Sequence, residues 1–193
     1  MGLTDEIKYL LLQQYGFKKG FFVCTELSYS LGISDVFCIS KNIEKKDIID
    51  IEVKVSKSDF LNDFRNKDIK HFTFRNLILN KTHSYSRYPS KFYFCVPEEI
   101  TEYCLSYINK NRLSYYGLIQ YKPVFYKSYN EKYLNVDSCL SVVKKAKRFN
   151  DITENDYNFF KDLMIRRLTN DCIGFNKTKA FLCGRYEKIK EIK

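Results

Sequence analysis

Residues 47–55 are the segment that most restricts how this chain can fold, because apolar and charged side chains alternate along it with the two-residue period of a β-strand. The apolar positions are Ile49, Ile51, Val53 and Val55. The charged positions between them are Asp50, Glu52 and Lys54. Burying a carboxylate or an ammonium group costs several kcal/mol unless the group is paired or binds a metal. The segment is therefore either an edge strand with one face in water or a buried strand that carries a polar site.

A second carboxylate precedes this strand. Asp35 lies seventeen residues before Glu52, near the start of another segment with strand composition, residues 33–40. The polar residues 41–46 favour a turn, so the two strands are expected to form a hairpin. Glu52 and Lys54 are two residues apart and point to the same side of their strand. We expect this hairpin to bring the two carboxylates and the ammonium group close together.

Such an arrangement suits one kind of chemistry. Two neighbouring carboxylates repel each other and stay ionised only when a positive charge compensates them. Mg²⁺ takes oxygen ligands, needs few protein carboxylates, and keeps positions for water and a phosphate oxygen. It lowers the pKa of a bound water and neutralises the charge that develops on phosphorus. With Lys54 orienting or deprotonating that water, the side chains favour metal-assisted hydrolysis of a phosphodiester.

These residues resemble the motif of the PD-(D/E)xK nuclease superfamily, in which a strand Asp precedes a Glu/Asp-x-Lys on the next strand. Ser34-Asp35 stands for the Pro-Asp, without the proline, and Glu52-Val53-Lys54 matches in full. The resemblance implies that Asp35, Glu52 and the Val53 carbonyl bind Mg²⁺ or Mn²⁺. It also implies that Lys54 positions the attacking water.

The sequence is similar in particular to the MmcB-like DNA-repair proteins of this superfamily and their phage-borne relatives. The resemblance covers roughly residues 20–125, and its motifs are colinear: Thr25-Glu26, Asp35, the run from Glu52 to Asp63, Phe92 to Pro97, and Gly117-Leu118-Ile119. Residues 66–90 differ from that branch, and only Lys67 is placed there. A further acid often assists the metal in the superfamily. The closer branch favours Glu26 in this catalytic role, with Glu6 as the alternative.

The charge of the chain indicates its partner. It has 33 Lys and Arg against 23 Asp and Glu, a formal net charge of +10, which favours a polyanion, nucleic acid before membrane. Basic residues follow the predicted site, interleaved with aromatic residues that can stack on unpaired bases. The residues expected to contact DNA are Ser56, Lys57, Arg65, Lys67, Lys70, Arg87 and Lys91. Ser56 and Asp59 also fit a helix capping box, and each basic residue alternatively belongs to a solvated surface. A second basic cluster, residues 144–148, either extends the DNA track or lies on a helix surface.

The order of elements predicts the fold class. We expect one α/β domain with a restriction-endonuclease-like core, a central mixed β-sheet flanked by helices, over residues 1–149, and a helical C-terminal extension, residues 150–193, packed on that core. Helices are expected over residues 4–15, from residue 56, over residues 98–109, and from residue 150. The last of these has an apolar face formed by Phe159, Phe160, Leu163 and Met164. Strands are expected over residues 20–26, 33–40, 47–55 and 92–96 and within residues 115–125, whereas residues 71–90 show no clear period.

Targeting signals and cysteine spacing indicate the cellular compartment. The sequence shows neither a secretory signal nor a membrane span. Its seven cysteines are odd in number and no pair forms C-x-x-C, which predicts reduced thiols rather than disulfides, zinc or an iron–sulfur cluster. We expect a cytoplasmic protein. A homodimer is also expected, because many enzymes with this core pair two subunits to cut two strands.

Together these features predict a Mg²⁺-dependent DNA endonuclease that acts in DNA repair, recombination or phage DNA processing. One alternative is a nuclease-fold adaptor that binds DNA or protein with weak or no turnover. Another is a phage-type interaction protein for which the basic surface alone suffices. The presence of Asp35, Glu52 and Lys54 together favours the enzyme, because a decayed site usually loses one of them.

Overall fold

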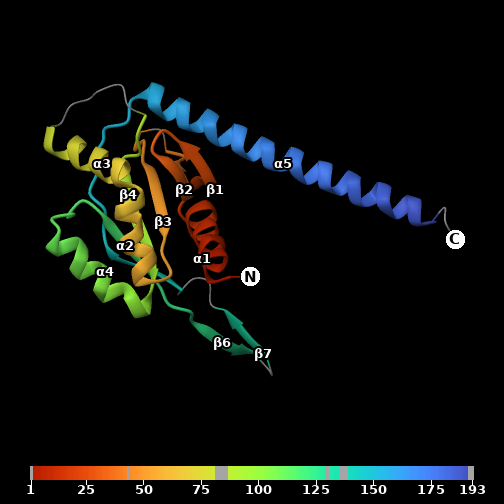
Figure 1. The fold of residues 1–193 in the computed structure, drawn as a ribbon, viewed down its shortest axis with the longest axis horizontal. Helices are drawn as coiled ribbons and strands as arrows, with labels where there is room; N and C mark the ends of the chain where they lie inside the picture. Colours follow the sequence, from red (N-terminus) through yellow and green to blue (C-terminus); the bar gives the residue numbers. More distant parts are fainter. Residues whose placement is uncertain (1, 43, 81–86, 129–130, 135–138, 191–193) are drawn as a thin grey trace.

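The computed structural model describes residues 2–42, 44–80, 87–128, 131–134 and 139–190, and it shows a six-stranded mixed sheet flanked by helices (Figure 1). The strands follow the order β1-β2-β3-β4-β5-β8. Their bounds are β1 (Phe21–Tyr29), β2 (Gly32–Ser40), β3 (Ile48–Val53), β4 (Lys91–Pro97), β5 (Gly117–Tyr121) and β8 (Leu140–Lys144). The first three strands form an antiparallel meander, β4 and β5 join it in parallel, and β8 is antiparallel to β5. A separate antiparallel pair consists of β6 (Phe125–Ser128) and β7 (Glu131–Leu134).

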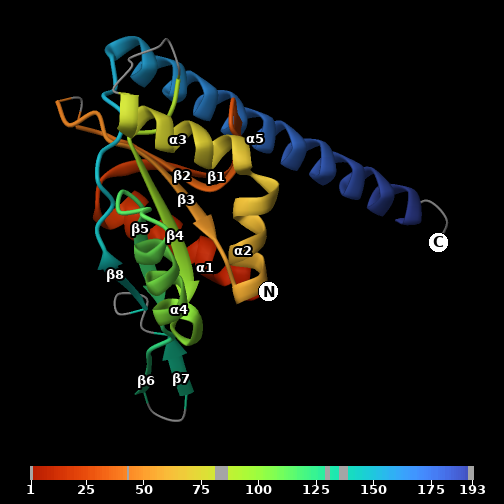
Figure 2. The ribbon, with the colours of Figure 1, turned by 60° about the vertical axis from the view of Figure 1, so that its left-hand side comes forward.

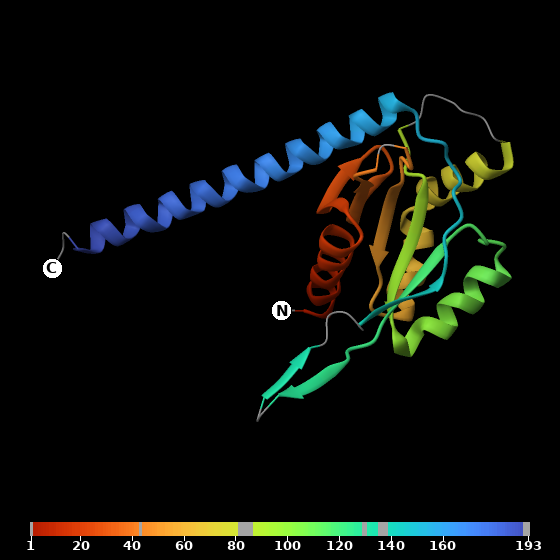
Figure 3. The same ribbon diagram turned by 180° about the vertical axis from the view of Figure 1, so that it is seen from behind.

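Helices cover both faces of this sheet (Figures 2 and 3). On one face lies α1 (Leu3–Leu12), which continues into a π-helical segment, η1 (Gln13–Lys18). The opposite face carries α2 (Lys57–Asn66) and α3 (Asp68–Asn80), which together connect β3 to β4, and α4 (Glu98–Lys110), which connects β4 to β5. The long α5 (Glu154–Lys190) begins over β1 and β2 and continues well past the sheet (Figure 1).

The alternating sequence of β3 contributes to both layers of the core. Ile49, Ile51 and Val53 pack in the cluster that includes α1. The polar residues between them face α2 and α3, and every residue of β3 is buried. Because β2 and β4 flank β3 on its two sides, the alternating segment is a buried central strand and not a solvated edge strand.

Aromatic side chains form the second layer, between the sheet and α2, α3 and α4. Phe60, Phe74, Phe92, Phe94 and Tyr116 are all fully buried there. Their rings meet in edge-on or tilted geometries, with centroids 4.8 Å apart for both Phe92–Phe94 and Phe92–Tyr116. Such pairs contribute about 0.5–1.5 kcal/mol each beyond the burial of their area. These contacts therefore fix the positions of α2 and α3 on the sheet.

The apolar face predicted for the C-terminal helix is confirmed at the start of α5. Phe160 and Met164 are buried against β1 and β2, and the Phe160 ring lies 5.2 Å from that of Phe37. Phe159 and Leu163 are partly buried beside them. Within the described part of the chain, no helix has the length and apolar character needed to cross a membrane.

Two elements differ from expectation. Residues 68–80 form α3, although their sequence shows no helical period, because Lys70 is buried in the interior while Ile69 and Phe72 are exposed. The basic residues 144–148 do not lie on a helix, because they end β8 and continue as irregular chain. The Lys144 ammonium at the end of β8 donates to the carbonyl of Ser114 at 2.7 Å. The helix surface is therefore wrong, and the DNA track stays a prediction.

Candidate active site

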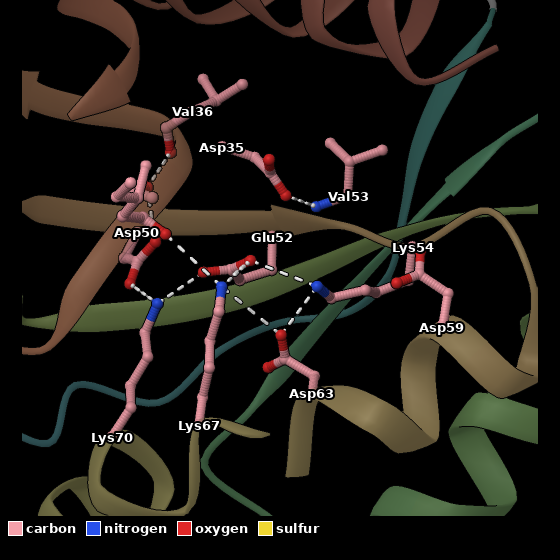
Figure 4. A network of polar contacts seen from close by, with 12 residues as sticks. Asp35, Val36, Asp50, Glu52, Val53, Lys54, Asp59, Asp63, Lys67 and Lys70 are labelled. Atoms are coloured by element: carbon pink, nitrogen blue, oxygen red, sulfur yellow. Dashed lines mark hydrogen bonds and ion pairs between the residues drawn. The ribbon is translucent and has the colours of Figure 1, made fainter. Parts of the chain in front are cut away.

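Strands β2 and β3 carry the two predicted carboxylates to the same end of their hairpin. Val36 pairs with Ile51, so the next residues along, Asp35 and Glu52, lie opposite each other where the described pairing ends. Figure 4 shows the Asp35 side chain turned toward the end of β3, and that of Glu52 turned toward the lysines of α3 and the end of α2. The two acids end neighbouring strands, but their side chains contact cations of different layers: Asp35 meets Lys8 of α1, and Glu52 meets Lys70 of α3.

Glu26 lies opposite Asp35 on the other side, as the register of the β1–β2 pair requires. Its backbone φ is 55°, a left-handed conformation that costs a residue with a Cβ roughly 1–2 kcal/mol. Strain of this kind concentrates at functional sites. The register of β1 and β2 thus places Glu26 beside Asp35.

Lys8 of α1 joins these two acids. Its ammonium lies 2.9 Å from Asp35 Oδ1 and also contacts Glu26 Oε1. Burial disfavours the charged form of Lys8, but the two carboxylates outweigh burial and raise its pKa. The alternative acid, Glu6, instead accepts a hydrogen bond from the Tyr121 hydroxyl at 2.6 Å. Sequence reasoning missed Lys8, because nothing in its local pattern links α1 to the strands.

Asp35 is also tied to the backbone of β3. Its Oδ2 accepts a hydrogen bond from the Val53 amide at 2.9 Å. The N–H and C=O of one strand residue point to the same side, so the Val53 carbonyl is directed toward β2 as well. Burial and the negative charge of Glu52 raise the pKa of Asp35, although Lys8 opposes them. Of the two carboxylates predicted to bind the metal, Asp35 is the more accessible, with 22% of its side chain exposed.

Glu52 is surrounded by three lysines, and only 1% of its side chain is exposed. Its Oε2 lies 2.7 Å from the Lys67 ammonium and 3.3 Å from that of Lys54, and its Oε1 lies 2.6 Å from that of Lys70 (Figure 4). Burial alone would favour the neutral acid, but these cations lower the pKa of Glu52. The carboxylate is therefore ionised at neutral pH.

Lys54 is charged at neutral pH. Although burial disfavours its ammonium form, Glu52 and Asp63 outweigh burial and raise its pKa to about 12. The shortest of its contacts is with Asp63 Oδ1, at 2.7 Å. Of the two roles predicted for Lys54, the structure favours donating a hydrogen bond over removing a proton.

Lys70 is placed differently from the prediction. Its side chain is fully buried, and its ammonium lies 2.6 Å from both Asp50 Oδ2 and Glu52 Oε1. Asp50 also accepts hydrogen bonds at 2.6 Å from the Tyr29 and Ser34 hydroxyls. Lys70 therefore neutralises buried acids and has no surface from which to contact a DNA phosphate.

The predicted ligands have the donor chemistry that Mg²⁺ prefers, although in this structure both oxygens of Glu52 contact lysines and those of Asp35 contact Lys8 and the Val53 amide. Asp35, Glu52 and the Val53 carbonyl offer oxygen atoms only, and the Lys8 ammonium already stands as a cation between Asp35 and Glu26. Within the described residues, no group of three or more His, Cys, Asp or Glu side chains gathers around one point. The predicted ligand set does not need one, because it contains two carboxylates.

Three of the remaining residues predicted to contact DNA lie at α2, whereas Arg87 and Lys91 precede and begin β4, at the opposite end of the β3–β4 pair from Glu52. Ser56 caps α2 by accepting a hydrogen bond from the Asp59 amide at 3.1 Å. Lys57 and Arg65 are exposed on α2, and the Lys57 ammonium lies over the Tyr103 ring. The other two have protein partners: Lys91 pairs with Asp47 at 2.9 Å, and the Arg87 guanidinium lies 4.0 Å from the centre of the Phe159 ring.

Acid is expected to weaken the fold through the buried carboxylates. Burial alone would raise the pKa of both Glu52 and Asp63. The charge of Lys70 lowers the pKa of Glu52, and the hydrogen bond from His71 lowers that of Asp63, so that both pKa values are below their usual range. Such groups contribute stability that is complete above their unfolded pKa and is lost as the pH falls toward the folded one. Asp35, with a raised pKa, acts in the opposite direction. Urea unfolding from about pH 5 to about pH 3 should show a falling free energy of unfolding, less steep in Asp63→Asn. An unfolding free energy that is constant over that range would contradict this.

Comparisons with known proteins bear on the fold. No family model and no curated protein matches the sequence. Among solved structures, the chain is similar to the SPO1766 protein of unknown function from Silicibacter pomeroyi, with a TM-score of 0.51 and 14% sequence identity over 82% of this chain and 81% of that one. At this identity the likeness establishes a shared α/β fold and nothing about chemistry.

Proposed function

We propose that this protein is a metal-dependent DNA endonuclease of the PD-(D/E)xK type, similar to the MmcB-like branch. One observation carries the proposal: neighbouring strands set Asp35 beside Glu52 at the end of the sheet, with Lys54 held at Glu52. The sequence motif and the net charge of +10 support the same conclusion. A fold shared with the Silicibacter protein is compatible with it and says nothing of the reaction.

Each residue then has a role in phosphodiester hydrolysis. Asp35, Glu52 and the Val53 carbonyl would hold Mg²⁺ or Mn²⁺, which when bound supplies charge neutralisation at phosphorus and a lower pKa for water. Lys54, as an ammonium, donates a hydrogen bond that orients the attacking water. To take part, Glu52 would give up one lysine contact, and Lys67 is the partner most able to move, because 29% of its side chain is exposed. Lys67 is then free to meet a phosphate.

Cleavage assays test the proposal. Purified protein is incubated with single-stranded, nicked and branched DNA in Mg²⁺, in Mn²⁺ and in EDTA. We expect wild-type protein to cut only with the metal, and Lys54→Ala to reduce the rate about 10²–10³-fold, as removal of one transition-state donor does. Asp35→Asn is the cleaner ligand variant, because Glu52→Ala also leaves three lysines without their partner.

A matched acid outside the site provides the control. Asp156 caps the start of α5 through Thr153, and Asp156→Asn should cut at the wild-type rate. If wild-type protein cuts no better than Asp35→Asn and Lys54→Ala, the enzymatic proposal is wrong.

One observation favours the alternative of a nuclease-fold binding module. Three lysines neutralise Glu52 without any metal, which is a stable arrangement for a protein that only binds. Such a module would bind DNA with a steep salt dependence that EDTA does not change, and would leave the DNA intact. Binding and cleavage measured on the same preparation separate the two functions.

A further inference from the structure

Three polar residues of the matched run, Ser56, Asp59 and Asp63, have no part in the proposed chemistry. The first two fix the chain just after Lys54. Ser56 Oγ accepts from the Asp59 amide at 3.1 Å, and Asp59 Oδ2 accepts from the Val55 amide at 3.2 Å. This differs from a standard capping box, in which the second acceptor binds the amide of the capping residue itself. The backbone that carries Lys54 into α2 is therefore held on both sides of the turn.

Asp63 holds the other end of the Lys54 side chain. It is on α2, is 3% exposed, and places Oδ1 2.7 Å from the Lys54 ammonium. Glu52 Oε2 is farther from the same ammonium, at 3.3 Å. Lys67 lies 3.5 Å from Asp63 Oδ1. The Lys54 ammonium therefore lies between two buried acids. The closer one, Asp63, is not among the predicted metal ligands.

Asp63 is in turn oriented by His71. The His71 Nε2 lies 2.8 Å from Asp63 Oδ2, and its Nδ1 contacts the Tyr116 hydroxyl. Because an ionised carboxylate only accepts hydrogen bonds, Nε2 carries the proton toward Asp63. In the neutral ring, Nδ1 then accepts from Tyr116. The Phe64 ring stacks on His71 with a centroid distance of 4.4 Å, which fixes the plane of the imidazole.

We infer that Asp63, oriented by His71, is a positioning residue that sets the Lys54 ammonium for reaction. This inference rests on the proposed nuclease function. Asp63 and His71 are buried beneath the site and do not reach a substrate. They act on the reaction only through Lys54, as the orienting partners of a catalytic group do in other enzymes. The Tyr116–His71–Asp63–Lys54 series thereby connects the aromatic layer to the end of β3.

Steady-state kinetics test the inference. Asp63→Asn, which keeps the shape and removes the charge, should lower kcat between about 10- and 100-fold with KM and Mn²⁺ affinity unchanged. His71→Gln, which keeps an N–H donor, should lose less. Asp156→Asn is the control acid and should match wild type. A merely structural Asp63 would lower the melting temperature and the folded fraction while the folded protein kept its kcat.

A double-variant cycle shows whether the effect passes through Lys54. In a Lys54→Ala background, Asp63→Asn should cause no further loss of rate, because the group it positions is gone. Losses that multiply would overturn the inference. Should Asp63→Asn fail to fold, His71→Gln decides: full kcat in that folded variant also overturns it.

A second readout does not depend on cleavage. In a crystal structure of Asp63→Asn or His71→Gln, we expect the Lys54 ammonium to leave its present position beside residue 63. An unmoved ammonium in both variants would overturn the inference even if the protein is an active nuclease. If Lys54 is displaced in the variants but the wild-type protein cuts no DNA, the proposed function is overturned and the inference about Lys54 stands.

Discussion

Replacing Lys70 by methionine is expected to lower the free energy of unfolding by about 3–5 kcal/mol, the cost of leaving a buried charge without its partner. The Lys70 ammonium is the buried counter-charge of both Asp50 and Glu52, at 2.6 Å from each. Methionine keeps most of the side-chain volume, so the loss is electrostatic rather than a cavity effect. Urea unfolding followed by circular dichroism measures the difference.

A matched lysine provides the control for that measurement. Lys91 pairs with Asp47 at 2.9 Å but is partly exposed, and such pairs contribute about 0–1 kcal/mol. Lys91→Met should therefore have a small effect. Adding Asp50→Asn to Lys70→Met should restore part of the lost stability, because Asp50 loses the ammonium group that pairs with it, whereas Glu52 keeps Lys67 and Lys54. Equal losses for Lys70→Met and Lys91→Met would contradict the burial argument.

Gly117→Ala is expected to destabilise the protein by about 1–3 kcal/mol or more through overpacking. Gly117 pairs with Tyr93 across β4 and β5, and a Cβ at this position would overlap the Tyr93 ring. It would also lie 2.8 Å from the backbone nitrogen of Ala146, which cannot yield as a flexible side chain can. Thermal unfolding should show a clear fall in the melting temperature.

Gly16→Ala is the matched comparison. Its added Cβ would meet Val23 at 3.7 Å, an ordinary contact, and alanine is the better residue in a helical segment. This variant should be neutral or slightly stabilising. Tyr93→Leu should relieve part of the Gly117→Ala loss by removing the ring. If Gly117→Ala unfolds at the wild-type temperature, the close packing of β5 on Tyr93 is not a constraint.

Much of the sheet could be predicted from local pattern. The two-residue alternation of β3 and the polar turn before it indicate a hairpin, and the structure has that hairpin with Asp35 and Glu52 at its end. Asp59 and Ser56 indicate the start of α2, and Ser56 is indeed its capping residue. These features depend on residues close in sequence, so a single chain is enough to reveal them.

The cations of the site could not be predicted in the same way. Lys8 reaches Glu26 from a different element, and hydrophobic periodicity carries no information about such a contact. In α3 the rule that apolar residues are inside fails locally, because Lys70 is drawn inward by acids on β3. One signal was present. Asp63, Lys67 and Lys70 recur at spacings of four and three residues, which marks one face of a helical stretch.

The connection from β3 to β4 through α2 and α3 also affects the order in which the site forms during synthesis. A ribosome releases the acids of β2 and β3 first, and the lysines of the crossover emerge later in the same direction. A nascent chain that ends before Lys67 lacks the Lys67 and Lys70 ammonium groups, which lie 2.7 Å and 2.6 Å from Glu52. The same Lys70 ammonium group lies 2.6 Å from Asp50. The buried acids of β3 therefore reach their full set of cations only after α3 has been synthesised.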